Sequence, residues 1–224
     1  RTGDSVFAVA YSPDGKKLAA GGADRAIRIY DLASSKQLLT IEDHADWVMD
    51  VAWAPDGKKL ASASRDKTSK VFDAKTGDSL VTFNSHGQPV FGVGFSTDGN
   101  QVVTSGRDKN IRVWNTKDAK QVRAIAGFGD EVFRVVVAKD GKIYSSSADK
   151  TARIHTVADG KQVRSLAGHK DWVYSVDVTA DSKVIATGSY DGEIRIWNAA
   201  DGKNTITFFA APGYKAPQAA AAAK

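Results

Sequence analysis

Histidine, hydroxyl and aspartate side chains recur together in this chain, and these residue types can build a catalytic triad or a metal site. The sequence has four histidines and no cysteine, which excludes thiolate metal ligands, a cysteine nucleophile and disulfide bonds. Two groups combine histidine, threonine, aspartate and tryptophan at one spacing: His86, Thr104, Asp108 and Trp114, and His169, Thr187, Asp191 and Trp197. Catalysis by such a group is the first hypothesis that the residue types suggest.

The recurrence of these groups argues against catalysis. An active site needs one asymmetric, solvent-accessible constellation, whereas equivalent positions of a repeat are buried in separate units. Apart from His155 and His169, which fall in different elements, the histidines lie about 42 or more residues apart, so they do not form a metal site. We therefore expect no catalytic residue, no metal and no cofactor.

An internal repeat supplies the elements that position these residues. The phrase Val-x-x-Val-x-aromatic, with valine replacing the aromatic residue in the last two copies, leads each copy, in steps of 42, 42, 42 and 41 residues. The leading valines are Val6, Val48, Val90, Val132 and Val173. Its apolar spacing of three and then two residues predicts a strand with a β-bulge. A turn with Asp-Gly follows this strand in the first four copies, and the fifth copy has Asp181-Ser182 instead. A second turn carries an aspartate in every copy, and three more short strands complete each copy. The pattern predicts an all-β protein of five four-stranded antiparallel units, the blades of a β-propeller.

Gly168-His169 at the start of a copy, with Tyr30-Asp31 or Trp197-Asn198 closing a third strand, resembles the WD-repeat β-propeller family, including its bacterial members. The resemblance covers all five copies and implies blades at about 1–43, 44–85, 86–127, 128–168 and 169–212. It also implies that the two histidine groups are buried hydrogen-bond networks, complete in copies three and five. The other copies lack members and should depend more on apolar packing.

The number of blades leaves ring closure open. Five blades need about 72° each and seven need about 51°, and propellers of both sizes are possible. Small second-strand residues such as Ala19, Ala61 and Gly188 resemble those of seven-bladed family members. With the seven-bladed wedge angle five blades leave a gap, so we expect a segment of a longer seven-bladed propeller, its missing blades supplied by upstream sequence or by another chain; a closed five-bladed ring is the alternative. Residues 213–224, rich in alanine and proline, should form a frayed tail.

One rim of the propeller is the predicted binding surface. In the family, the loops between blades share this rim with the turns between second and third strands. Here these positions hold aromatic residues and arginine, which are enriched at binding hot spots. The predicted partner-binding residues flank the leading valines or precede the turn aspartates: Phe7, Trp47, Met49, Arg65, Phe91, Arg107, Phe133, Trp172, Tyr174 and Tyr190. The alternative for the bulge aromatics is that they fill the central channel.

Charge and hydropathy limit the other partners. The chain has 31 Lys and Arg against 26 Asp and Glu, and the opposite rim mixes lysines such as Lys58 and Lys59 with aspartates, which disfavours nucleic acid. No apolar run approaches the roughly 18–20 residues of a membrane helix, and no signal peptide opens the chain. We expect a soluble, non-enzymatic scaffold for a protein or peptide. The alternatives are an accessory propeller of a larger bacterial enzyme whose catalytic domain is absent here, and a scaffold for self-assembly.

Overall fold

Antiparallel strands and the turns between them make up the whole described part of the protein. The computed structural model describes residues 4–210, and the tail predicted at 213–224 lies outside this range. Twenty strands pair into five separate four-stranded sheets, and the strands of each sheet follow chain order. The predicted all-β fold of five four-stranded blades is therefore confirmed.

The blades are numbered 1 to 5 along the chain. Blade 1 comprises β1 (Val6–Tyr11), β2 (Lys17–Gly22), β3 (Ile27–Asp31) and β4 (Gln37–Ile41). Blade 2 comprises β5 (Val48–Trp53), β6 (Lys59–Ser64), β7 (Ser69–Asp73) and β8 (Ser79–Phe83). Blade 3 comprises β9 (Val90–Phe95), β10 (Gln101–Gly106), β11 (Ile111–Asn115) and β12 (Gln121–Ile125). Blade 4 comprises β13 (Val132–Val137), β14 (Lys142–Ser147), β15 (Thr151–Thr156) and β16 (Gln162–Ala167). Blade 5 comprises β17 (Val173–Val178), β18 (Val184–Ser189), β19 (Glu193–Asn198) and β20 (Asn204–Phe209).

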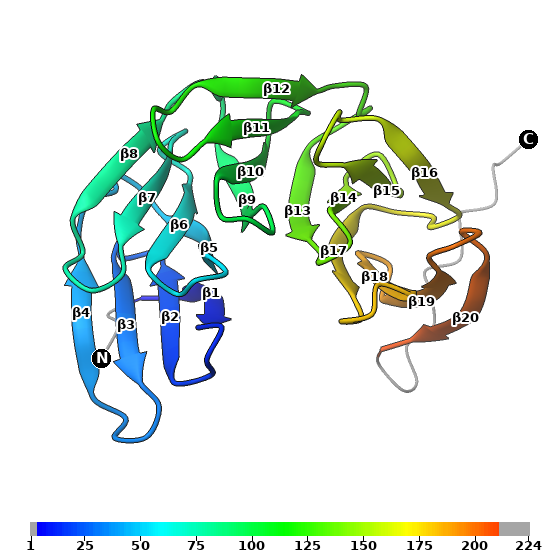
Figure 1. The fold of residues 1–224 in the computed structure, drawn as a ribbon. Helices are drawn as coiled ribbons and strands as arrows, with labels where there is room; N and C mark the ends of the chain where they lie inside the picture. The colour runs from blue at the N-terminus through cyan, green and yellow to red at the C-terminus, as the bar shows by residue number, and fades with distance from the viewer. Residues whose placement is uncertain (1–3, 211–224) are drawn as a thin grey trace, which may run out of the picture.

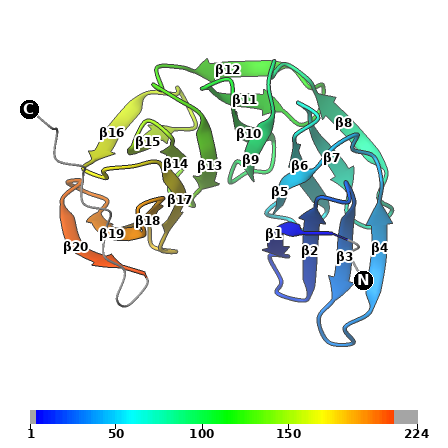
Figure 2. The ribbon, with the colours of Figure 1, turned by 180° about the vertical axis from the view of Figure 1, so that it is seen from behind.

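The blades follow one another around an open arc (Figure 1, and from behind in Figure 2). The first strands β1, β5, β9, β13 and β17 line its inner side, and the fourth strands lie on its outer side. Blades 1 and 5 stand at the two ends of the arc and do not meet. The number of blades in a complete ring stays a prediction.

Each first strand carries the bulge that its apolar spacing predicts. In β5, Val48 pairs with Ser64 and Asp50 with Ala63, so Met49 is the extra residue. The same irregularity occurs in the first strand of every other blade. A bulge re-aims the side chain that it contains. The five bulge residues are therefore placed alike, at the same end of the first strands: Phe7, Met49, Phe91, Phe133 and Tyr174.

The hydrophobic core lies between successive blades in four clusters. The leading valine of each of blades 2 to 5 is fully buried against the preceding blade, whereas Val6 of blade 1 is 46% exposed. Burying a valine side chain contributes about 1.5 kcal/mol or more. The arc is therefore held together mainly by apolar contact between neighbours, while hydrogen bonds hold each sheet.

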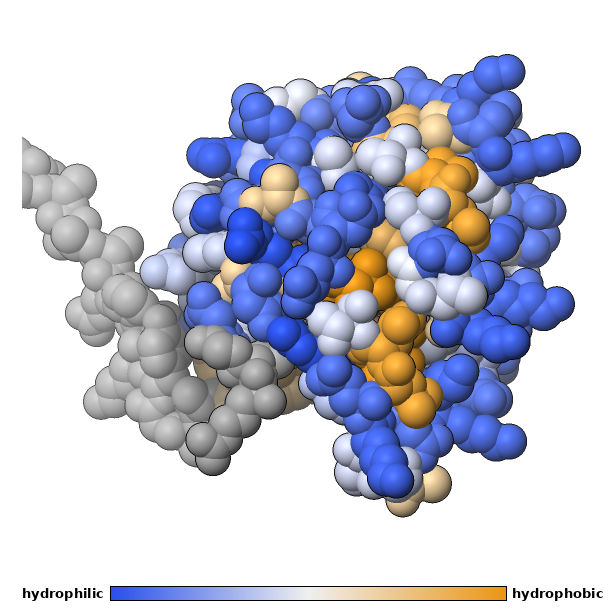
Figure 3. All heavy atoms as spheres, turned by 90° about the vertical axis from the view of Figure 1, so that its left-hand side faces the viewer, coloured by the Kyte–Doolittle hydropathy of each residue, from blue (hydrophilic) through white to orange (hydrophobic). Residues whose placement is uncertain are grey.

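The outer face on the side of blades 1 and 2 is mostly hydrophilic, with a band of hydrophobic side chains across it (Figure 3). The fourth strands on this side, β4 and β8, expose Leu38 and Leu80. Within residues 4–210 no helix has the length and apolarity needed to cross a membrane.

Candidate partner-binding rim

Buried histidine networks fix the turns beneath the rim, and the most extensive one lies in blade 2. The Nδ1–H of His44 donates to Asp66 Oδ2 (2.8 Å), and Ser62 donates its hydroxyl to His44 Nε2 (2.6 Å). The Thr68 hydroxyl donates to Asp66 Oδ1 (2.6 Å). Burial opposes ionisation of Asp66, but the hydrogen bonds from His44 and Thr68 hold the pKa of its carboxyl well below the ordinary value. Phe72 takes the place of tryptophan, so the network forms without one.

The expected four-residue network of blade 3 lacks its tryptophan. His86 bonds to Asp108 Oδ2 (3.0 Å) and to the Thr104 hydroxyl (2.8 Å). The buried indole N–H of Trp114 has no hydrogen-bond partner in the described part of the chain. The Trp114 ring instead stacks on Phe83 of blade 2, with centroids 4.8 Å apart and planes at 7°. The neighbouring blade, rather than the network, therefore sets the orientation of this ring.

Blade 5 departs from the expected network at its aspartate. The Trp197 indole N–H donates to the Thr187 hydroxyl (2.8 Å), which in turn bonds to His169 Nε2 (2.7 Å). The His169 Nδ1 atom has no partner among the described residues, although it was expected to meet Asp191. Arg195 of this blade pairs with Glu193 (Nε–Oε1 2.8 Å) rather than with the turn aspartate. In blade 3 the equivalent arginine pairs with the aspartate itself.

His169, Asp191 and Glu193 also offer three metal-ligating atoms within 4.8 Å of one another. The Arg195 guanidinium already holds Glu193, and its positive charge opposes a cation at this place. Burial, followed by the charge of Arg195, lowers the pKa of His169, in keeping with a neutral imidazole. We assign the cluster to packing within blade 5.

The bulge residues gather around one cavity at the inner side of the arc. A cavity of about 420 Å³ is lined by all five of them, together with Asp50, Arg134 and Ser175. The sequence places the five in separate repeats, and the arc brings them together. They line this hollow, while the loop residues of the predicted rim lie around it.

Four aromatic residues of blades 4 and 5 form a contact cluster beside this cavity. The Phe133 and Tyr174 rings are 4.7 Å apart, and the Trp172 ring lies 6.0 Å from Tyr190 and 6.2 Å from Tyr174. Trp172, Tyr174 and Tyr190 remain 43%, 42% and 65% exposed. Phe91 of blade 3 extends the cluster through a 6.0 Å contact with Phe133. Large aromatic side chains that stay exposed in a group are typical of interaction sites.

The remaining predicted rim residues lie in blades 1 to 3. The Phe7 ring contacts Trp47 at 5.2 Å, and the Arg65 guanidinium lies 3.8 Å over the Trp47 ring. Arg107 of blade 3 pairs with Glu131 of blade 4 (2.7 Å). Two of the rim residues are thus arginines whose charges are already engaged within the chain.

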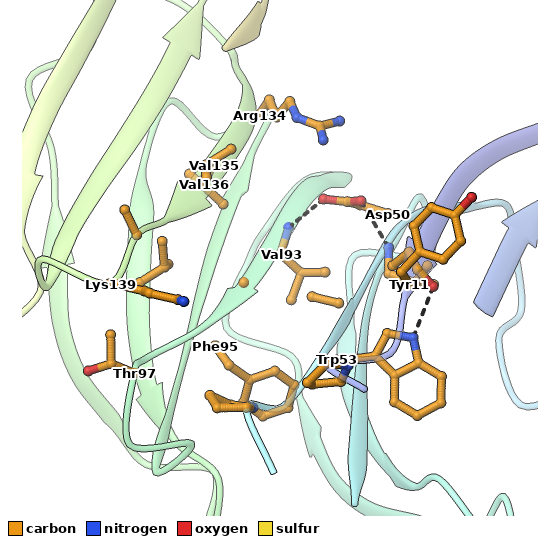
Figure 4. Close-up of a pocket in the computed structure, with 18 of the residues that line it drawn as sticks. Tyr11, Asp50, Trp53, Val93, Phe95, Thr97, Arg134, Val135, Val136 and Lys139 are labelled. Atoms are coloured by element: carbon orange, nitrogen blue, oxygen red, sulfur yellow. Dashed lines mark hydrogen bonds between the residues drawn. The ribbon is translucent and has the colours of Figure 1, made fainter. Parts of the chain in front are cut away.

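Sequence reasoning missed Asp50 and Arg134, which line both this cavity and a larger one of about 680 Å³ further along the first strands. The two lie at the same end of the larger cavity (Figure 4). Asp50 accepts the backbone N–H groups of Val51 (2.9 Å) and Val93 (3.0 Å), and so connects blades 2 and 3. Burial raises the pKa of Asp50 to about 6. The sequence signal that could have identified these two residues is a charged side chain directly after the bulge residue. The other three copies have Ala8, Gly92 or Ser175 at that position.

Comparison with known proteins identifies the repeat. The family model described as "WD domain, G-beta repeat" matches residues 2–31, 35–73, 77–115 and 160–198, more than half of the chain. Each of the last three ranges joins the fourth strand of one blade to three strands of the next. The stretch between 115 and 160 contains most of blade 4, in which Phe128 and His155 replace the usual histidine and tryptophan.

Two bacterial proteins share about one repeat with the chain. A "Probable serine/threonine-protein kinase PkwA" from Thermomonospora curvata is 47% identical over 47 residues, which are 21% of this chain and 6% of that protein. An "Uncharacterized WD repeat-containing protein alr3466" from Nostoc sp. is 46% identical over 44 residues, 20% of this chain and 3% of that protein. Both matches thus cover a small fraction of the relative's length. On the strength of the repeated family match and the five blades, the chain belongs to the WD40 repeat family.

Proposed function

We propose that the chain is a non-catalytic scaffold that binds a protein or peptide at the aromatic rim described above. The observation that carries this proposal is the cluster of Phe133, Trp172, Tyr174 and Tyr190, three of which remain exposed. Exposed tryptophan and tyrosine contribute most to binding energy when a partner covers them. The adjoining cavity of about 420 Å³ offers room for one side chain of that partner.

The opposite rim supports the same choice of surface. Its lysines pair with aspartates close in sequence, as in Lys161–Asp159 (3.0 Å) and Lys203–Asp201 (3.8 Å). These lysine side chains are each 82% exposed. Solvated pairs of alternating sign contribute little to affinity. We therefore place the partner on the aromatic rim.

A peptide-display screen tests the proposal. Peptides selected on the intact chain should lose affinity for the Trp172→Ala and Phe133→Ala variants. They should keep it for a matched control in which Lys58→Ala and Lys59→Ala are combined. Affinity that follows the lysine pair and ignores the aromatic residues would move the site to the other rim.

The kinase named among the relatives favours a second candidate function. The matched repeat occupies 6% of that protein, so a WD40 segment there accompanies other sequence. By analogy, this chain would regulate an enzyme to which it is joined. Its rim would then select the substrate or regulator of that enzyme. Capture of such a protein only by a longer chain carrying the catalytic part would favour this candidate.

We also propose that further blade surface covers the two ends of the arc. Val9 and Tyr11 of blade 1 are 61% and 69% exposed, whereas their equivalents Val51 and Trp53 are 4% and 9% exposed. At the other end, Phe208 is 46% exposed. Apolar faces of this kind associate in water. Sedimentation velocity should show self-association of the chain that Val9→Lys weakens; a monomer at all concentrations would contradict this proposal.

A further inference from the structure

Blade 2 contains an arginine-binding arrangement made from its own residues. The Arg65 guanidinium lies 3.8 Å over the Trp47 ring, and its Nε donates to Asp46 Oδ2 (2.7 Å). A guanidinium is planar, so it can stack on an indole face while its edge meets a carboxylate. Asp46 and Trp47 therefore form a two-part receptor for arginine, one part aromatic and one part anionic.

Three hydrogen bonds fix the backbone of this arrangement. The Arg65 N–H donates to the Trp47 carbonyl (2.9 Å), which places residue 65 beside the indole. The Ser64 hydroxyl donates to the Asp46 carbonyl (3.2 Å), and the Trp47 N–H donates to Asp46 Oδ1 (2.8 Å). The last bond holds the carboxylate next to the ring.

Blade 5 repeats this frame bond for bond. The Tyr190 N–H donates to the Trp172 carbonyl (2.9 Å), the Ser189 hydroxyl to the Asp171 carbonyl (3.3 Å), and the Trp172 N–H to Asp171 Oδ1 (2.8 Å). The sequence Asp-Trp-Val is also the same in both blades. The receptor pair of blade 2 thus has a counterpart in Asp171 and Trp172.

The two blades differ at the position of the arginine itself. Tyr190 stands where blade 2 has Arg65, and it supplies a second aromatic ring but no charge. Within residues 4–210 the Asp171 carboxylate forms no ion pair, while Asp46 forms one with Arg65. Trp172 is 43% exposed and Tyr190 is 65% exposed, so both are accessible from solvent.

We propose that Asp171, Trp172 and Tyr190 bind an arginine side chain of the partner, in the manner in which Asp46 and Trp47 hold Arg65. This inference rests on the proposed function, because it assigns the chemistry of the ligand at the same rim. Arginine fits better than lysine, since only a guanidinium combines ring stacking with a forked donor edge. The Glu131 carboxylate, shared with Arg107, adds negative charge on the side of blade 4.

The test uses two short peptides as probes, acetyl-Gly-Arg-Gly-amide and its citrulline counterpart, which has nearly the same shape without the charge. Indole N–H signals of the chain are followed by NMR, and the Trp172→Phe variant identifies the signal of Trp172. The arginine peptide should shift this signal saturably. The citrulline peptide should bind at least about tenfold more weakly, or not detectably. Asp171→Asn should reduce the affinity for the arginine peptide by a similar factor. Equal binding of the two peptides would overturn the proposal.

Two substitutions exchange the properties of the blades. Tyr190→Arg should rebuild the internal contact of blade 2 and abolish binding of the arginine peptide, with an unchanged midpoint of thermal unfolding. Arg65→Ala should do the reverse and give a second responsive signal, from Trp47. Binding to the Tyr190→Arg variant as tight as to the unmodified chain would also refute the inference.

The peptide-display screen separates this inference from the proposed function. Selected peptides that depend on Trp172 but contain no arginine would refute the arginine assignment and leave the rim as the binding surface. Absence of any peptide that depends on the rim would refute the proposed function, while the NMR probes would still decide whether the pocket accepts a guanidinium.

Discussion

The network of blade 2 makes the Asp66→Ala substitution the most informative perturbation of the fold. The carboxylate accepts hydrogen bonds from His44 Nδ1–H, from the Ala45 N–H (3.0 Å), and from the N–H and hydroxyl of Thr68 (2.9 and 2.6 Å). The His44 side chain is only 1% exposed, so water cannot replace the lost acceptor there. The substitution therefore leaves buried donors unpaired.

The expected loss follows from these contacts. A buried donor without a partner costs about 1–3 kcal/mol, and the Nδ1–H of His44 is such a donor. Thr68 is partly buried and loses the acceptor of both its N–H and its hydroxyl, whereas Ala45 is exposed and can bind water. We expect Asp66→Ala to lower the free energy of unfolding by about 3–4 kcal/mol. The matched control is Asp24→Ala in blade 1, which loses a longer bond from Ala26 N–H (3.3 Å) and an ion pair with Arg28. This control should cost about 1 kcal/mol.

Urea unfolding at pH 7, followed by circular dichroism, measures both losses. The Asp66→Asn variant adds a test of charge, because the pKa of Asp66 is lowered in the folded protein. Stability from a carboxyl with a lowered pKa is complete above its unfolded value of about 3.9 and is lost as the pH falls below it. The advantage of the unmodified chain over Asp66→Asn should therefore shrink in acid. An Asp24→Ala variant that is as unstable as Asp66→Ala would refute the assignment of the network.

Three further predictions concern other parts of the molecule. Asp191→Ala should destabilise less than Asp66→Ala in the same urea experiment, because Asp191 makes no bond to the blade histidine; an equal loss would contradict this. Trp47→Ala, Trp172→Ala and Arg107→Ala should each weaken a rim-binding peptide by about 1 kcal/mol or more in isothermal titration calorimetry, with little change in stability; unchanged affinity would exclude the rim. Between pH 4 and values above pH 6, Asp50→Asn should gain about 1–3 kcal/mol of stability relative to the unmodified chain, because a carboxyl whose folded pKa is raised to about 6 loses stabilisation as the pH rises through that value. A pH-independent loss underlies this gain, since an amide oxygen accepts only one of the Val51 and Val93 N–H groups; a difference in urea midpoints that does not change with pH would show that burial of Asp50 has no such effect.

Strand positions and bulges were predictable because they depend on local pattern. The valine spacing of one copy specifies a strand, its bulge and its buried face, and repetition makes the pattern unmistakable. The placement of Phe7, Met49 and Phe133 at one end of the first strands follows from the same rule.

The hydrogen-bond partners were less predictable because they depend on neighbours outside the motif. Phe83 from the preceding blade orients Trp114, and the side chain of Glu193 pairs with Arg195. Neither effect is visible in the spacing of the histidine groups. Asp50 and Arg134 were missed for a related reason, since they share a cavity only after three blades have assembled.

The aromatic rim also has a mechanical consequence, because its cluster bridges two separately hydrogen-bonded sheets. Phe133 belongs to blade 4, and Trp172, Tyr174 and Tyr190 belong to blade 5. A ligand that covers both sides acts as a clamp across this joint and resists changes in the curvature of the arc. Within residues 4–210, blade 5 has a single neighbouring blade, so such a clamp would slow its local opening more than that of the central blades. Binding of a partner at the rim and the rigidity of the five blades would then be thermodynamically coupled, so that each favours the other.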